Sequence, residues 1–301
     1  MNITSTFLVN IFLFFPIIRA FDEDEVYISI TEAPFVLAVV QVTHDGPQID
    51  CMATLVHRRW ALTSSQCFAK PDNKFIAYGI SDIKQFSKNQ TLPIEEIIYH
   101  PHYHQHINNN DIAIVKFKTP VEFDKTVKNI EIEGTTWPQD DRALNRECIS
   151  YRFGQTRRKL SAKKVDARHG KSACHCYPYI RNICLALIDG DSICYGDFGG
   201  PLICDGKLVG IANTIVHLEQ CVGRDTSPSC GDKDVMSMYT FICPYLQWVK
   251  WYVRETPAPP ASCDALRNAE TVRLTVVECL KEINLEDLGT NIIILMENFV
   301  N

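Results

Sequence analysis

Residues that could take part in acyl transfer are gathered in three short stretches of this chain. The first is Cys194–Pro201 (CYGDFGGP), a glycine-rich loop with Asp197 beside Phe198. The others are Thr63–Cys67 (TSSQC) and Asn110–Lys116 (NDIAIVK). Covalent catalysis needs a nucleophile such as a hydroxyl or thiol next to a general base. A phenyl ring has no lone pair to attack a carbonyl, so Phe198 cannot be that nucleophile.

The Cys194–Pro201 loop resembles the nucleophile loop of the chymotrypsin/trypsin family of serine proteases, C-x-G-D-S-G-G-P. Phe198 stands where that family carries its catalytic serine. The resemblance also covers Cys148–Gly154 (CISYRFG), which is similar to the C-x-x-x-G-W-G motif that opens the second barrel. Ordered motifs at matching spacings identify the family, and the missing hydroxyl implies a homologue without a nucleophile.

Gln66 and Asp111 stand at the other two positions of the family's catalytic triad. Thr63–Cys67 looks like T-A-A-H-C with Gln66 in place of the histidine, and Asn110–Lys116 resembles N-D-I-A-L-x-K with Asp111 as its aspartate. A glutamine amide has no useful basicity near neutral pH. The resemblance therefore implies an inactive homologue, not an enzyme, in which Asp111 accepts hydrogen bonds from backbone amides or from Gln66.

The resemblance covers roughly residues 33–254 and implies an all-β fold. It predicts two antiparallel six-stranded barrels, at about residues 21–140 and 141–243, and a C-terminal helix at 244–254. The β-branched run Phe35–Val42 fits a buried strand independently of the resemblance.

The substrate cleft of the family is expected to be altered as well. Counting back six residues from Phe198 puts Ser192 at the base of the specificity pocket, which implies an uncharged pocket. Thr214 and Ile215 replace a Trp-Gly pair that forms one pocket wall, and a branched side chain at a glycine position should block the entrance. Ser192 is also the cleft residue considered as an alternative nucleophile.

Asp197 is expected to lack the partner that it has in active relatives. In those, cleavage after Arg or Lys frees an ammonium that pairs with the aspartate before the nucleophile. Here no Lys or Arg lies between Phe21 and Pro34, and the segment opens with the acidic run Phe21–Glu25. Because a buried unpaired carboxylate is costly, Asp197 should turn toward solvent, find another donor or stay protonated.

Composition indicates a secreted globular protein. The net charge of -6 argues against a nucleic-acid binder. Residues 1–20 have the apolar core (Phe7–Ile18) and small final residue (Ala20) of a signal peptide. Thirteen cysteines indicate an oxidising compartment, and Asn89 lies in a glycosylation sequon.

The odd number of cysteines leaves at least one thiol free or paired with another chain, so an intermolecular disulfide is an expectation. The resemblance implies four internal bridges: Cys51–Cys67, Cys148–Cys204, Cys194–Cys221, and Cys184 with either Cys176 or Cys174.

Two segments raise ligand hypotheses. His100–His106 places four histidines at alternate positions, which suits Zn, Cu or Ni, but no carboxylate or cysteine is spaced to complete a site. A solvated loop without metal is preferred, and no cofactor is expected. Arg157–Lys171 carries seven Lys or Arg against one acid and is expected to be an exposed loop. An anionic partner such as a glycosaminoglycan is the alternative interpretation.

Residues 255–301 form an extension beyond the resemblance. Pro257–Pro260 is expected to be a stiff linker, and an apolar stripe from Cys263 onward predicts a helix. A continuous helix would hold Cys263 and Cys279 about 24 Å apart, too far to pair with each other. Their candidate partners are Cys230, Cys243 or another subunit. The apolar C-terminal end is too short to span a membrane and either packs on the body or docks a partner.

The favoured interpretation is a secreted, non-catalytic serine protease homologue. It would bind an extracellular protein as a cofactor, decoy or regulator. Loss of the nucleophile or the base of such a triad costs a factor of roughly 10⁶ in kcat. The alternatives are a hydrolase with residual or unconventional activity and a structural secreted protein.

Overall fold

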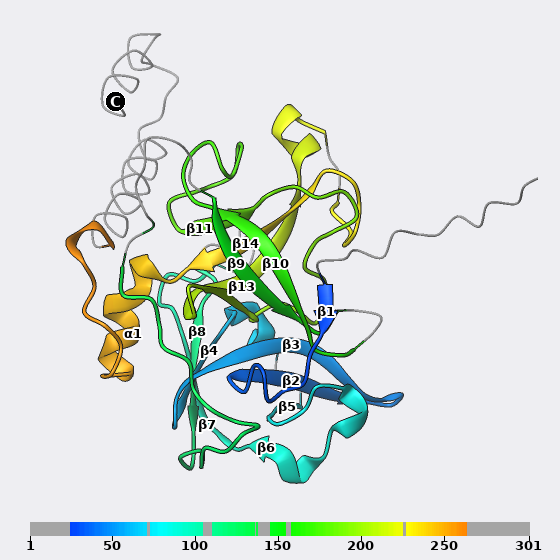
Figure 1. Cartoon of the computed structure of the whole chain (residues 1–301), viewed down its shortest axis with the longest axis vertical. Helices are drawn as coiled ribbons and strands as arrows, with labels where there is room; N and C mark the ends of the chain where they lie inside the picture. Colours follow the sequence, from blue (N-terminus) through cyan, green and yellow to red (C-terminus); the bar gives the residue numbers. More distant parts are fainter. Residues whose placement is uncertain are drawn as a thin grey trace, which may run out of the picture.

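The computed structural model describes residues 25–70, 73–104, 110–135, 137, 145–154, 158–224 and 227–263 (Figure 1). They form mostly β-strand, in two barrel-like sheets that pack against each other, and a short helix follows the second sheet. The predicted all-β fold with two barrels and a C-terminal helix is therefore confirmed. Among these residues no helix is both long and apolar enough to cross a membrane.

The first sheet is built from the N-terminal half of the chain, in the order β6-β5-β2-β3-β4-β8-β7. Its strands are β2 (Val36–Thr43), β3 (Gly46–His57), β4 (Trp60–Thr63), β5 (Lys74–Ala77), β6 (Thr91–Leu92), β7 (Ile94–Tyr99) and β8 (Ala113–Phe117). The β-branched run predicted as a buried strand is β2, and its residues 36–40 are all buried. Burial on both faces of the strand is what a continuous apolar run favours.

The second sheet has the order β1-β10-β11-β14-β13-β12-β9. Its strands are β1 (Glu25–Tyr27), β9 (Arg146–Arg152), β10 (Ser161–Arg168), β11 (Asn182–Leu185), β12 (Pro201–Cys204), β13 (Lys207–His217) and β14 (Val235–Phe241). Because β10 also pairs with β9, six strands close into a ring and β1 is added at the edge of β10. Each sheet thus has seven strands where six were expected, and β1 and β6 are the shortest of them.

The helices are short. The 3-10 helices are η1 (Ser65–Phe68), η2 (Ile83–Gln85), η3 (Lys88–Gln90), η4 (Leu218–Val222) and η5 (Cys243–Tyr245), and the α-helix is α1 (Leu246–Tyr252). In α1 the side chains of Leu246, Trp248 and Val249 are buried, which is the one-sided pattern of a helix packed on a sheet.

Twelve of the thirteen cysteines pair in six disulfides, and Cys279 lies outside the described residues. Two bridges are those expected, Cys51–Cys67 and Cys148–Cys204, and Cys184 pairs with Cys174 instead of Cys176. The remaining bridges are Cys176–Cys221, Cys194–Cys230 and Cys243–Cys263.

The expected Cys194–Cys221 bridge is wrong. Cys194 pairs with Cys230, with a Cα–Cα distance of 5.2 Å. The N–H of Gly231, next to Cys230, donates to the Ser192 hydroxyl over 2.9 Å, so the segment before β14 lies directly against the segment before Cys194. Cys221 instead lies in η4, the 3-10 helix after β13, and forms a disulfide with Cys176.

The basic stretch is a strand, so the expectation of an exposed loop is wrong for the part that the structure describes. Alternate residues of β10 (Ser161–Arg168) are buried, and the side chain of Lys163 is completely buried. Lys164, on the other face, is exposed and pairs with Glu147. Since Lys163 is used internally, the surface has fewer cations for an anionic partner than the sequence suggested, and that partner stays a prediction.

The segment after α1 packs on the body of the protein. Thr256 is buried, its carbonyl accepts a hydrogen bond from Lys250 Nζ over 2.6 Å, and Pro257 lies against Gly134. The Cys243–Cys263 disulfide fixes the end of this segment to the start of η5, so Cys243 is the partner of Cys263. The rest of the predicted tail helix lies outside the described residues.

Candidate functional site

The loop that carries Phe198 lies between the two barrels and is bonded to both. The Phe198 carbonyl accepts the N–H of Met52 from the first barrel over 2.7 Å, and the N–H of Gly199 donates to the carbonyl of Ala212 in the second over 2.8 Å. The Phe198 side chain is 8% exposed, and the ring of Tyr195, 65% exposed, packs edge-on against it at 5.6 Å. The residue at the nucleophile position is therefore part of the packed interior.

Glycine is required at Gly199 for the loop to take this shape. Its φ is +81°, and a Cβ there would lie 2.1 Å from the Met52 carbonyl oxygen and 2.4 Å from the Thr63 hydroxyl. Neither a side chain nor an ordinary backbone conformation fits these values. The glycines of the motif thus keep the loop in its place even though the serine is absent.

The partly buried Gln66 contacts the buried Asp111, as the resemblance implied. Gln66 Nε2 donates to Asp111 Oδ2 over 2.8 Å and to the carbonyl of Asn213 over 2.6 Å, and the Gln66 N–H donates to Asp111 Oδ1 over 3.0 Å. Ser64 Oγ also donates to Asp111 Oδ2. Burial raises the pKa of Asp111, while these hydrogen bonds act in the opposite direction. The amide is engaged as a donor at both of its hydrogens and has no lone pair on nitrogen to take a proton.

The residues assigned to the specificity pocket make contacts within the chain. Ile215 is 8% exposed. Its cross-strand partner in β14 is Ser237, whose hydroxyl accepts a hydrogen bond from the Ile193 N–H over 3.0 Å. The hydroxyl of Thr214 donates to the Ile215 carbonyl. Ser192 is buried and its hydroxyl accepts the Gly231 N–H.

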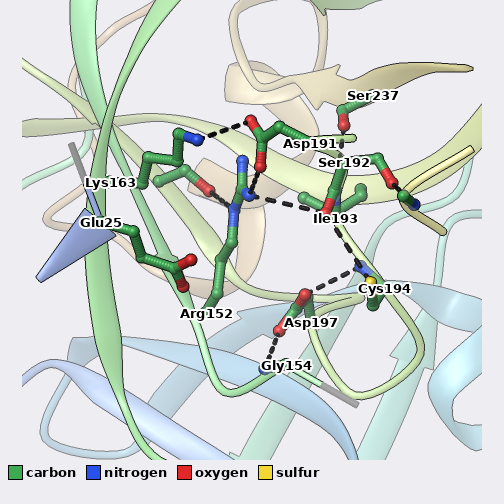
Figure 2. Close-up of polar contacts among 12 residues, drawn as sticks. Glu25, Arg152, Gly154, Lys163, Asp191, Ser192, Ile193, Cys194, Asp197 and Ser237 are labelled. Carbon is green, nitrogen blue, oxygen red and sulfur yellow. Dashed lines mark hydrogen bonds and ion pairs between the residues drawn. The ribbon is translucent and has the colours of Figure 1, made fainter. Parts of the chain in front are cut away.

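Asp197 finds other donors, which is one of the three outcomes expected for it. It is 1% exposed. Its Oδ1 accepts the Gly154 N–H and its Oδ2 accepts the Cys194 N–H, each over 2.8 Å (Figure 2). Oδ1 also accepts the Phe153 N–H over 2.9 Å. Burial raises the pKa of Asp197, and the charge of Arg152 and these three N–H groups oppose that shift.

A buried group of charges lies beside Asp197. Arg152, at the end of β9, points its guanidinium at Asp191, and Nη1 donates to Asp191 Oδ1 over 2.6 Å (Figure 2). Lys163 Nζ from β10 lies 3.2 Å from Asp191 Oδ2, and Arg152 Nε donates to the Ser150 hydroxyl over 2.9 Å. Burial acts to raise the pKa of Asp191, but Arg152 and Lys163 outweigh it and the pKa is lowered.

Sequence reasoning missed this charged group, although one signal was present. Arg152 stands at the first glycine of the C-x-x-x-G-W-G motif and ends a largely apolar strand. A charged residue at a motif glycine is unusual enough to have been singled out. Lys163 could not have been found in this way, since it was one of several cations in a basic stretch.

Of the alternating histidines, His100 and His102 have neighbouring rings, with centroids 5.8 Å apart. His100 packs edge-on against the rings of Tyr245 and Trp248, with ring centroids 5.1 Å apart in each pair. His102 and His104 are exposed, and His106 lies outside the described residues. Within the described part of the chain, no group of three His, Cys, Asp or Glu side chains is placed to hold a metal ion.

Acid should destabilise the protein through His100. Burial, then the charges of Arg181 and His102, lower the pKa of His100 from 6.5 to about 3. Below pH 6.5 the unfolded chain therefore binds a proton that the folded protein does not, and stability falls as the pH drops toward 3. The free energy of unfolding should lose about 1 kcal/mol per pH unit from this group.

The measurement is urea unfolding of the wild type and of His100→Phe between pH 7 and pH 4. The variant should show a shallower loss of stability, with a remainder from other groups such as His169, whose pKa burial also lowers. His44→Asn, at a fully exposed histidine, is the matched control and should follow the wild type. Equal slopes in His100→Phe and the wild type would refute the assignment.

A cavity of about 390 Å³ lies away from the triad positions. It is bounded by residues 129–132, Val56 and Lys207 of the barrels and by residues 253 and 255–257 of the segment after α1. None of Gln66, Asp111 and Phe198 lines this cavity.

Comparison with known proteins gives a consistent result. A family profile described as Trypsin matches residues 29–249. Trypsin-4 of Rattus norvegicus is 26% identical over 238 residues, covering 76% of this chain and 90% of the relative. Trypsin of Sus scrofa is 24% identical over 222 residues, with coverage of 70% and 88%. Kallikrein-8 of Homo sapiens is 27% identical over 220 residues, with coverage of 68% and 77%. The fold, the ordered motifs and a profile match over well more than half of its length show that this chain belongs to the trypsin family.

Proposed function

We propose that this chain is a secreted, non-catalytic member of the trypsin family that acts by binding an extracellular protein, as a cofactor, decoy or regulator. The proposal is carried by the contacts that Gln66 and Phe198 make within the chain. The partly buried Gln66 side chain donates two hydrogen bonds to groups of the chain, and the buried Phe198 ring packs against Tyr195.

Chemistry supports the absence of hydrolysis. Acyl transfer in this family needs a hydroxyl that attacks the carbonyl and a base that takes its proton. Phe198 has no such hydroxyl, and the Gln66 amide nitrogen has no lone pair to offer. Loss of either group costs a factor of about 10⁶ in kcat, and loss of both costs little more because the two act as a unit.

The alternative of a hydrolase that uses Ser192 has little support. Its hydroxyl is 7% exposed and is engaged by the Gly231 N–H. An activated serine instead donates its proton to a neighbouring base.

The retained scaffold supports a binding role. The framework of the fold is held by Asp111, by the loop glycines and by the disulfides. Surface loops on such a rigid framework can present a binding face. Tyr195 is one residue that such a face would include, because it is 65% exposed and lies beside Phe198.

Affinity capture with crosslinking from the source fluid tests the binding role. The full chain is compared with a chain that ends after Cys263, since this cut preserves the Cys243–Cys263 disulfide. Specific partners should be captured by at least one of the two. Loss on truncation would assign the binding to residues 264–301, whereas retention would assign it to the barrels. If neither captures a specific partner, the structural alternative is favoured and the proposal fails.

Secretion should be accompanied by glycosylation at Asn89. The Asn89 side chain is exposed on η3, and Thr91 follows at the sequon position. When the full chain is expressed in a eukaryotic secretory host, treatment with an N-glycosidase should lower its apparent mass by one glycan. Asn89→Gln and, independently, Thr91→Ala should remove that shift. A glycosidase-sensitive shift that survives both substitutions would place the glycan elsewhere, and retention of the chain in the cytoplasm would contradict secretion.

A further inference from the structure

One strand end holds the Asp191–Gly200 loop at two points. At the start of the loop, Asp191 accepts a hydrogen bond from Arg152 Nη1. In its middle, Asp197 accepts the N–H group of Gly154 (Figure 2). It also accepts that of Phe153, and these two residues directly follow Arg152. The position of Arg152 therefore determines where both parts of the loop can lie.

Charged side chains are buried at this place. The side chain of Arg152 is 4% exposed and that of Lys163 is 0% exposed, and both face the carboxylate of Asp191. The charge of Arg152 also acts on Asp197. Buried charges are tolerated only when they are paired and hydrogen-bonded. Glu25 is also close by, and it accepts a hydrogen bond from the Ser161 hydroxyl over 2.6 Å.

The segment that precedes the first barrel lies along the surface of the second. Strand β1 (Glu25–Tyr27) pairs with residues 161–163 of β10, and the side chains of Val26 and Tyr27 are 58% and 46% exposed. The Ile28 N–H continues this pairing by donating to the Leu160 carbonyl. From Glu25 onward the backbone is thus an edge strand beside the charged group.

We propose that Arg152 is a built-in replacement for the activating N-terminal ammonium of active relatives, so that this chain orders its Asp191–Gly200 loop without proteolytic cleavage. Arg152 occupies a motif position where those relatives have glycine, and its side chain supplies a permanent positive charge at the buried face of the loop. The protein then has no zymogen stage, and the loop is ordered as soon as the chain folds. This holds whether or not the proposed binding function is correct, because it concerns loop order alone.

Amide hydrogen exchange of the loop, measured on the full chain, tests the proposal. In Arg152→Met, exchange at Cys194 and at residues 197–200 should become at least about tenfold faster, because the charge that holds the loop is lost. Arg152→Lys keeps the charge and should stay within about threefold of the wild type. Arg146→Met is the matched control, since Arg146 lies on the same strand but pairs with Glu133 and Asp205 away from the loop; it should leave the loop unchanged.

A second comparison needs no substitution and so decides the matter even if Arg152→Met does not fold. The wild-type chain with a free α-amino group is compared with the same chain acetylated at that group. Equal loop exchange in the two forms is expected. Faster exchange in the acetylated form would show that an N-terminal ammonium holds the loop and would overturn the proposal, as would an unchanged loop in Arg152→Met.

Discussion

The double variant Gln66→His/Phe198→Ser is expected to be acylated by small activated esters such as p-nitrophenyl acetate about 10³-fold faster than the wild type. The contacts that would orient a histidine at position 66 and a serine at position 198 are present. Gln66 Nε2 lies 2.8 Å from Asp111 Oδ2, a distance that an imidazole N–H can also bridge. The backbone of Phe198 is fixed by Met52 and by the pairing of Gly199 with Ala212, so a serine hydroxyl would be presented at a defined place.

Each single variant is the control, because the nucleophile and the base act together. Gln66→His alone should stay at the wild-type rate, and Phe198→Ser alone should gain far less than the double variant. Peptide substrates should remain poor in all of them, since a branched side chain, Ile215, stands where the family has a glycine in the pocket wall. A rate equal to that of the wild type in the folded double variant would mean that the triad frame is not preserved. Stopped-flow release of p-nitrophenol gives the acylation rate directly.

Asp197→Ala is expected to lower the free energy of unfolding by about 3–5 kcal/mol, as removal of one partner from a buried charge group does. Three backbone N–H groups, from Phe153, Gly154 and Cys194, would lose their acceptor in a place from which water is excluded. An unsatisfied buried donor costs about 1–3 kcal/mol. The charge of Arg152 would also lose a neighbouring carboxylate.

Guanidinium unfolding with the disulfides intact measures this loss. Asp205→Ala is the matched control, because Asp205 also pairs with an arginine, Arg146, but its side chain is 77% exposed. An exposed ion pair contributes about 0–1 kcal/mol, so the control should unfold close to the wild type. A loss in Asp197→Ala no larger than that of Asp205→Ala would show that the Asp197 carboxylate does not hold the loop.

The motifs were sufficient to predict the two barrels and the contact between Gln66 and Asp111, because those residues lie in segments whose spacing is characteristic of the family. The hydrogen bond from Gln66 to Asp111 was also among the outcomes considered. These features could be predicted from local sequence because each motif is one continuous segment. The backbone geometry of such a segment depends on its own glycines and cysteines.

Features that depend on segments distant in the sequence were not predictable in this way. Arg152, Lys163 and Asp191 come from β9, from β10 and from the loop before Cys194, and only the folded sheet brings them together. The Cys194–Cys230 bridge was missed for the same reason, since Cys221 was the better match by order along the chain. The packing of His100 on α1 likewise pairs residues almost 150 positions apart.

The basic stretch shows how composition can mislead. Seven cations in fifteen residues suggested a solvated loop, yet alternate residues of β10 are buried and Lys163 is charge-paired inside the barrel. Every second residue from 161 to 167 is buried, which is the two-residue period of a strand. Most of these buried residues are small or apolar.

The central claim is that this trypsin-family chain does not hydrolyse peptides. Turnover of a broad peptide library by the purified full chain, with and without a serine-directed phosphonate and beside an active trypsin, tests it most directly. We expect no turnover above the uncatalysed background and no covalent label on the chain. Phosphonate-sensitive turnover with stoichiometric labelling would contradict the claim and would identify a nucleophile other than the residue at position 198.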